Sequence, residues 1–197
     1  MDWDCDVKSY LCFCEDPDFT VPCPSACPHC GHCVLHRHGK YHRDADALDG
    51  IYRMPVFRFL CVLPTCRKTT SVLPSFVGRH QRATWDLQEF AVSACDDGKT
   101  LEQVTEELSN LGCIDSVWTI LRWKQTWLQI LLENEGTLWA LALSVFPSLC
   151  MPVGAERPHS RLRWVSHVWE QIAPWRMGIG VFHGLHRLRQ QLPILSG

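Results

Sequence analysis

Two pairs of cysteines lie well apart in the sequence, at a spacing that suits a metal ion. The first pair lies in Cys27-Pro28-His29-Cys30-Gly31, and the second pair is Cys61 with Cys66. The proline fixes one backbone angle and the glycine lets the chain fold back, so both thiolates of the first pair aim at one point. Four thiolates in two pairs are typical of a structural, tetrahedral zinc site. We therefore predict one Zn²⁺ held by Cys27, Cys30, Cys61 and Cys66.

Other assignments of these thiols stay open at this point. The second pair has four intervening residues where two are commonest, so buried structural cysteines without metal are an alternative. Side chains beside the first pair could replace one of its ligands, namely Cys23, Cys33, His29, His32, His36 and His38. The thiols of the N-terminal segment could form a second site, although their spacings match no established pattern: Cys5, Cys12, Cys14 and Cys23.

The segment between the two pairs must bring them together. Residues 34–43 and 51–60 are strand-like, and Asp49-Gly50 gives the turn signal between them. A hairpin with a pair of cysteines at each open end is a zinc ribbon. The sequence therefore predicts a ribbon as the element that positions the metal ligands.

Composition limits the classes of protein that fit. The 197 residues carry a net charge of −2, so nucleic acid held by bulk charge alone is excluded and any such contact must rest on local patches. Twelve cysteines would suit a secreted disulfide scaffold, but the N-terminus shows no basic start followed by an apolar run. No apolar run reaches the roughly 18 residues that span a bilayer. We expect a cytoplasmic protein with reduced thiols.

Three amphipathic helices are predicted after the ribbon. Thr100 with Gln103 three residues later forms a capping box for the second helix, and Asn110-Leu111-Gly112 ends it. The third helix starts at residue 115 or 116 and carries an apolar stripe. This order is typical of a helix-turn-helix, although three such helices also make ordinary small bundles.

A helix-turn-helix would place specific side chains against DNA. Ser116, Thr119 and Arg122 project away from the stripe and would face the major groove. We include Lys124 among the DNA contacts, although it falls on the apolar side, which leaves the rotation of this helix open by part of a turn. Basic residues between the ribbon and the helices would meet phosphates: Arg67, Lys68, Arg79 and Arg82. A polar linker is the alternative for this stretch.

The ribbon and the third helix carry a resemblance to a known group of proteins. Four runs of the ribbon resemble the amino-terminal zinc ribbon of bacterial insertion-sequence transposases, and still more the small bacterial zinc-ribbon proteins found with mobile elements. These runs are Cys27 to Gly31, His36-Arg37-His38-Gly39-Lys40-Tyr41, Arg58-Phe59-Leu60-Cys61 and Arg67-Lys68-Thr69-Thr70-Ser71-Val72-Leu73-Pro74-Ser75-Phe76. Ser116-Val117-Trp118-Thr119-Ile120-Leu121-Arg122-Trp123 is similar to the third helix of their helix-turn-helix. The likeness spans about residues 22–130 and departs at the Cys61–Cys66 spacing and at Thr70. It implies DNA binding in a mobile element.

The C-terminal third shows no catalytic pattern. Residues 137–146 are apolar on every side and predict a buried helix, residues 152–158 a linker, and residues 162–172 an amphipathic helix with Trp164 and Trp169. A transposase needs a carboxylate cluster for metal ions, and this segment holds only four acids. We therefore expect a non-enzymatic protein in which residues 133–197 bind a transposase, a recombinase, another protein or a second copy, or else simply complete the core.

These interpretations combine into one expectation. We predict an α+β protein with five segments, in order: an N-terminal extension (1–22), a zinc ribbon (23–78), a helix-turn-helix (79–132), an apolar helix (133–151) and a C-terminal helical interaction segment (152–197). The predicted function is zinc-dependent binding of double-stranded DNA as a targeting or accessory factor of a mobile element. The alternatives are a protein-interaction adaptor and an RNA- or guide-complex-binding subunit.

Overall fold

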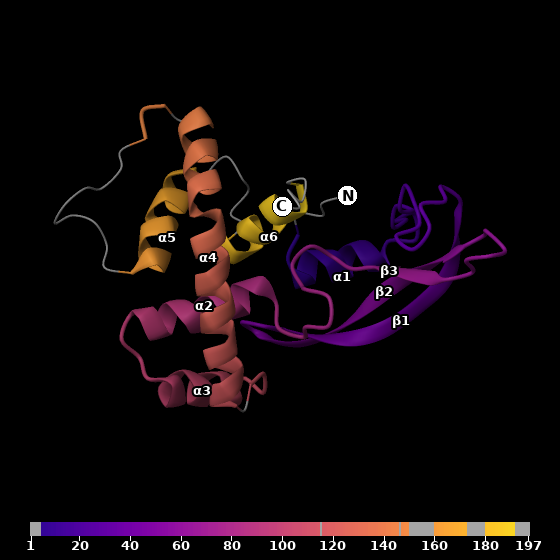
Figure 1. Ribbon diagram of the computed structural model, residues 1–197. Helices are drawn as coiled ribbons and strands as arrows, with labels where there is room; N and C mark the ends of the chain where they lie inside the picture. Colours follow the sequence, from indigo (N-terminus) through magenta and orange to yellow (C-terminus); the bar gives the residue numbers. More distant parts are fainter. Residues whose placement is uncertain (1–4, 115, 146, 150–159, 173–179, 192–197) are drawn as a thin grey trace. The chain divides into compact units, whose positions relative to one another are not determined.

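The computed structural model describes residues 5–114, 116–145, 147–149, 160–172 and 180–191 (Figure 1). The chain divides into two units, of which the first holds residues 1–47 and 51–84 and the second holds residues 48–50 and 85–197. All strands lie in the first unit, and all helices except the first lie in the second. This segregation confirms the predicted α+β class.

A three-stranded antiparallel sheet forms the centre of the first unit. β1 (Leu35–Ala47) and β2 (Gly50–Cys61) make the predicted hairpin, and Gly50, with a φ of 143°, follows the turn. β3 (Thr69–Val72) pairs with β2, with Phe57 opposite Val72 and Leu60 opposite Thr69. The linker interpretation is therefore wrong for residues 69–72. Threonine and valine are favoured in strands, and β3 lies along an edge that β2 would otherwise expose.

A helix covers part of this sheet, in a segment whose sequence has no clear period. α1 (Val7–Glu15) begins at Asp6, whose carboxylate accepts a hydrogen bond from the Ser9 N–H at 2.7 Å. Val7 and Tyr10 are buried, and the Tyr10 hydroxyl donates to the Pro55 carbonyl at 2.7 Å. The acidic residues around this short helix hide its apolar side in the sequence. The segment is therefore part of the fold of the first unit.

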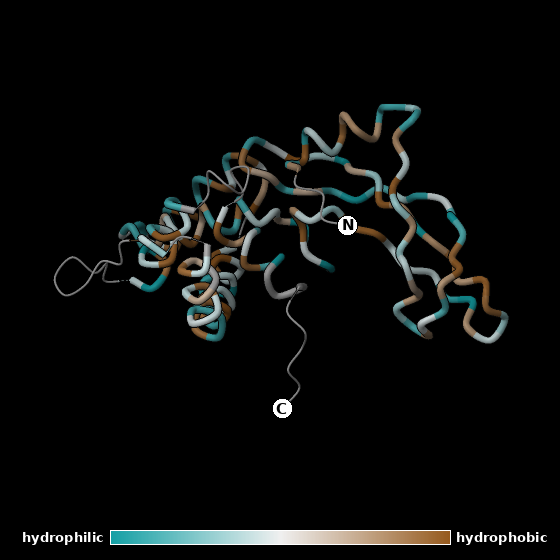
Figure 2. The backbone as a smooth tube through the Cα atoms, turned by 90° about the horizontal axis from the view of Figure 1, so that it is seen from above, coloured by the Kyte–Doolittle hydropathy of each residue, from teal (hydrophilic) through white to brown (hydrophobic). Residues whose placement is uncertain are grey.

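The second unit begins with the two short helices that the sequence predicts. α2 (Trp85–Asp96) is followed by Gly98 at a φ of 100°, and α3 (Leu101–Asn110) is followed by Gly112 at a φ of 74°. The capping box is confirmed, because the Gln103 N–H donates to the Thr100 hydroxyl while the Thr100 N–H donates to the Gln103 side chain. Hydrophobic and hydrophilic residues are mixed along the helical part of the chain, as expected for amphipathic elements (Figure 2).

α4 (Val117–Val145) corrects the predicted division of residues 115–146 into two helices. It runs for 29 residues without a break at Gly136. A glycine inside a helix costs only about 1 kcal/mol, and burial of Leu131 and Leu138 on either side of it offsets that cost. The prediction that residues 137–146 are buried on every side is also wrong, because Leu138 is buried whereas Leu143 is 41% exposed. Residue 146 lies outside the described residues.

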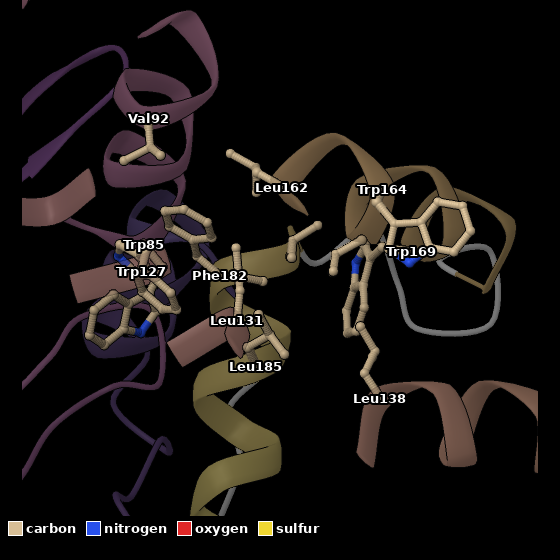
Figure 3. Close-up of a cluster of buried hydrophobic side chains, with 12 residues drawn as sticks. Trp85, Val92, Trp127, Leu131, Leu138, Leu162, Trp164, Trp169, Phe182 and Leu185 are labelled. Atoms are coloured by element: carbon tan, nitrogen blue, oxygen red, sulfur yellow. The ribbon is translucent and has the colours of Figure 1, made fainter. Parts of the chain in front are cut away.

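The C-terminal helices complete the core of the second unit. α5 (Arg161–Ile172) packs on α4 and α2, and α6 (Val181–Gln191) packs on α2 and α5. Figure 3 shows how their buried side chains meet those of α2 and α4, with the rings of Trp127 and Phe182 stacked at 3.9 Å. Trp164 and Trp169 are buried in this cluster. Their interpretation as interface anchors is therefore wrong. The predicted linker at residues 152–158 lies outside the described residues.

Candidate metal centre and nucleic-acid interface

The first cysteine pair is held by a tight backbone loop. The Gly31 N–H donates to the Cys27 carbonyl and the Cys27 N–H donates to the His32 carbonyl, both at 2.8 Å. Gly31 has a φ of 74°, a conformation that costs glycine little and other residues more. The loop therefore turns Cys27 and Cys30 toward the same point, as Cys-Pro-X-Cys-Gly predicts.

The second pair is held by a loop of different shape. The N–H groups of Cys66 and Arg67 donate to the Leu63 carbonyl at 2.9 and 3.0 Å, and the Cys61 N–H donates to the Lys68 carbonyl at 3.0 Å. Arg67 takes a left-handed φ of 48° where the first loop has glycine. Four residues between the cysteines thus form a full turn that brings Cys66 back to Cys61.

The four thiols of the two loops converge. The sulfurs of Cys27 and Cys66 are 3.9 Å apart and those of Cys30 and Cys61 are 3.6 Å apart. All four sulfurs lie within 4.8 Å of one another. A tetrahedral zinc ion with bonds of about 2.3 Å separates its sulfurs by about 3.8 Å, whereas a disulfide needs about 2 Å. The donor set and its spacing therefore fit a tetrahedral metal ion.

Electrostatics at this cluster favour a bound cation. Hydrogen bonds from the backbone of His29 and then of Cys30 lower the pKa of the Cys27 thiol to about 7. The His32 backbone also lowers the pKa of Cys30, but desolvation and the surrounding sulfurs outweigh it and raise that pKa to about 12. Burial raises the pKa of Cys61. A thiolate therefore forms readily at Cys27, whereas Cys30 and Cys61 favour the neutral thiol, and a divalent cation among the sulfurs would stabilise their thiolates.

Apolar packing behind the sulfurs sets the position of the cluster. Cys27 and Cys61 belong to a buried group with Val21, Leu35 and Phe59. The alternation of Phe57, Phe59 and Cys61 along β2 signals this inward face in the sequence, whereas the contribution of Val21 has no such signal. This packing holds Cys27 and Cys61 against the sheet.

The other cysteines and histidines near the ribbon do not join this cluster. The Cys23 thiol donates to the Leu35 carbonyl and the Cys33 thiol to the Gly31 carbonyl. Among the described residues, no second group of three or more metal-binding side chains comes together. The structure therefore selects Cys27, Cys30, Cys61 and Cys66 from the alternatives as the group that could hold a metal ion.

Of the predicted major-groove residues, Thr119 and Arg122 lie in the first turns of α4, and Ser116 directly precedes it. Arg122 is exposed, whereas Ser116 and Thr119 are half-buried. Lys124 is half-buried near Cys95 of α2, where its charge opposes the rise that burial causes in the pKa of that thiol. Burial of Ile120, Trp127 and Leu131 places the apolar stripe of α4 against the core, and Lys124 lies half-buried at its border.

Sequence reasoning missed two exposed neighbours of Arg122. Trp118 is 71% exposed and Gln125 is exposed. Their spacing of four and three residues from Arg122 places all three on one side of the helix. The same spacing rule could have found them from the sequence.

The predicted phosphate contacts differ in their surroundings. Arg67, Lys68 and Arg79 are exposed. Arg82 instead donates to the buried carboxylate of Asp46 at 2.8 Å and lies 3.9 Å from Asp44. Desolvation raises the pKa of Asp46 and the Arg82 charge opposes that rise. Arg82 therefore has a role within the fold, where it neutralises a buried acid beside Thr84.

Comparison of the chain with family models, with curated proteins and with solved structures finds no match. None of the described helices combines the length and the apolar character that a membrane crossing requires. The site that the structure defines is therefore the cluster of Cys27, Cys30, Cys61 and Cys66, which could hold a metal ion.

Proposed function

We propose that this chain is a zinc-dependent double-stranded DNA-binding protein, acting as a non-catalytic targeting or accessory factor of a bacterial mobile genetic element. The observation that carries the proposal is the convergence of Cys27, Cys30, Cys61 and Cys66 within 4.8 Å at one end of a β-hairpin. This arrangement supports the zinc-ribbon assignment, and the resemblance in residues 22–130 supports the mobile-element context.

Zinc in such a site supplies cross-linking rather than reaction chemistry. Structural zinc sites contribute on the order of 10 kcal/mol of apparent folding free energy to small modules. Here the four thiolates would hold the ion, while Val21, Leu35 and Phe59 keep them in place. The ion would fix the open end of the hairpin and the start of β3.

The helical part of the proposal rests on α2, α3 and α4, which pack on one another. A capped α3, the Gly112 turn and a long α4 with an exposed arginine near its start are consistent with a helix-turn-helix. In this assignment Arg122 would reach a guanine edge.

The non-catalytic part of the proposal has support from the acids of α4. Glu135 forms an ion pair with Arg161 of α5 at 2.6 Å, and Glu133 accepts a hydrogen bond from Gln129 at 2.9 Å. These carboxylates serve contacts within the second unit. The proposal therefore assigns DNA binding to this chain and the reaction to a separate enzyme of the mobile element, which the chain recruits as its partner.

A salt series on zinc-loaded protein tests the proposal. Duplex DNA binding should weaken linearly in log–log form with salt, by about 0.9 per phosphate neutralised. Elemental analysis should give one zinc per chain, and Cys30→Ser should lose it. Arg122→Ala should weaken the preferred sequence by about 1–3 kcal/mol and relax one base position. Binding that is absent, or that does not depend on salt, would refute the DNA assignment.

A second candidate, a zinc-ribbon adaptor for another protein, is favoured by one observation. Trp118 is 71% exposed at the start of α4, and tryptophan is enriched at the centres of protein interfaces. If Trp118→Ala abolishes capture of a recombinase partner while duplex binding is unchanged, this surface binds protein.

A further inference from the structure

The two units of the chain differ in the sign of the charge that they carry. Residues 19–43 and 50–84 contain nine arginines and lysines and no aspartate or glutamate. By contrast, residues 85–145, which include α2, α3 and α4, contain ten acidic residues and three basic ones. A polyanion is therefore attracted to the ribbon rather than to these helices.

One side of the sheet is covered by an acidic segment. Met54 and Val56 of β2 pack with Val7 and Tyr10 of α1, which places α1 on their side of the strand. Four exposed acidic residues flank this helix or lie at its end, namely Asp6, Glu15, Asp16 and Asp18. A polyanion that approached the α1 side would therefore meet carboxylates.

The pairing of β2 with the chain around β3 places a lysine on the other side of the sheet. Phe57 and Cys61 are odd-numbered residues of β2 and so alternate with those that face α1. Phe57 lies opposite Val72, and the same register places Cys61 opposite Lys68, whose carbonyl accepts a hydrogen bond from the Cys61 N–H at 3.0 Å. Lys68 therefore shares the side of Phe57 and Cys61.

Two arginines join Lys68 on this side. The Arg37 guanidinium lies 5.3 Å from the centre of the Phe57 ring, a cation–π contact that holds it beside the sheet. Arg53 precedes Phe57 by four residues of the same strand, so alternation gives it the same side. All three cationic residues are exposed. We call this group (Arg37, Arg53, Phe57 and Lys68) the Phe57 face.

The spacing of these cations indicates the kind of anion that they suit. Arg53, Phe57 and Cys61 are four residues apart on β2, so the three cations are attached at intervals of about 13 Å, at about 3.3 Å per residue. A single phosphate group is bound tightly where charged donors converge on it, whereas these cations follow one another along the strand. A nucleic-acid backbone carries its charge along its whole length. The Phe57 face therefore suits a polyanion better than a small phosphorylated ligand.

We propose that the Phe57 face is the main phosphate-binding surface of the first unit and that its occupant is the backbone of double-stranded DNA. This inference rests on the proposed function and specifies which side of the ribbon meets the duplex. Exposed arginine and lysine side chains donate to phosphate oxygens and fix the position of a protein on the duplex without reading its sequence. The α1 side, with its carboxylates, faces away from the DNA.

The test compares three variants of the full chain, each of which loses one positive charge. Lys68→Gln and Arg53→Gln act on the Phe57 face. Lys40→Gln is the control, because Lys40 is exposed on β1 and lies near Cys14 of α1. Burial raises the pKa of the Cys14 thiol, and the Lys40 charge opposes that rise. Zinc content and binding to a duplex over a salt series are measured for wild type and for each variant.

Lys68→Gln and Arg53→Gln should each lower the salt slope by about one and weaken binding to all sequences alike, whereas Lys40→Gln should keep the wild-type slope. If Lys68→Gln loses zinc, Arg53→Gln, eight residues from Cys61 along β2, decides the test. If wild type binds duplex DNA and the three variants share one slope, the Phe57 face is refuted but the proposed function stands. If wild type binds no duplex, both fail. Tighter binding to single-stranded RNA of the same sequence would overturn duplex DNA as the occupant.

Discussion

Glu89 provides a sharp test of how the second unit is held together. Its carboxylate, on α2, accepts a hydrogen bond from the Phe182 N–H at 2.9 Å, at the start of α6, 93 residues along the chain. Burial raises the pKa of this carboxyl, and hydrogen bonds from Phe182 and Val181 only partly oppose the rise. A side chain from the first helix of the unit thus caps the last one.

The sign of the pH dependence follows from the raised pKa. A carboxyl whose pKa is higher in the folded state than in the unfolded state contributes stability that is fully present below its unfolded pKa. That contribution is lost as pH rises through the folded pKa, because ionisation in the buried site is unfavourable. For one proton the slope is at most about 1.4 kcal/mol per pH unit.

Glu89→Gln keeps the acceptor oxygen and removes the titration. As pH rises above about 4.3, the usual pKa of glutamate, we expect the free energy of unfolding of this variant to increase relative to that of wild type. Glu89→Ala should instead lose about 1–3 kcal/mol, because the Phe182 N–H loses its partner. Glu102→Gln, at an exposed position of α3, is the control, and its stability should depend on pH in the same way as that of wild type.

Denaturant titrations at several pH values would measure these differences. Eight of the nine tryptophans lie in residues 85–197, so tryptophan fluorescence reports mainly on this unit. If Glu89→Gln and wild type keep the same stability difference from pH 4 to pH 8, the carboxyl does not titrate with a raised pKa and the reasoning fails.

Three further predictions follow from the packing of the second unit. Gly136→Ala should stabilise α4 by about 1 kcal/mol, since its added Cβ meets nothing within 4 Å. Gly184→Ala should destabilise the second unit by roughly 1–3 kcal/mol, because its Cβ would strike the buried Trp169 ring. Melting temperatures that shift in the same direction for both variants would contradict this pair of predictions. Gln88→Ala should cost about 3 kcal/mol, because it leaves the buried Trp127 indole N–H without the acceptor that now lies 2.9 Å away; denaturant titration measures it. Deleting residues 155–197 should prevent folding of the second unit, and a cooperative unfolding transition in the remaining helices would show that the C-terminal helices are dispensable.

Local rules recovered the ribbon and the short helices from the sequence. The cysteine spacing and the turn at Asp49-Gly50 predicted the hairpin, and the thiols of Cys27 and Cys66 converge as the spacing suggested. Thr100 and Gln103 predicted the start of α3. Each of these features is specified within a few residues, so the surrounding fold does not alter it.

The errors lie where distant contacts decide. Taken alone, Gly136 predicts the end of a helix, but the burial of Leu131 and Leu138 on either side of it stabilises α4 across this position. The sequence around Trp164 and Trp169 suits a protein interface as well as a core, because it does not reveal which elements α5 packs against. β3 and α1 are stabilised by β2 and by the sheet, and their own sequences give only weak signals.

The pairing of α2 with α6 has a consequence for how the protein is made. During synthesis, α6 cannot cover the side of α2 that is buried in the folded unit until Phe182 leaves the ribosome. The first unit is complete at residue 84, much earlier in the chain. Chains translate at about 5–20 residues per second, so the apolar surface on α2 stays exposed for roughly 5–20 seconds. A nascent chain of this kind is a natural client for chaperones that act at the ribosome.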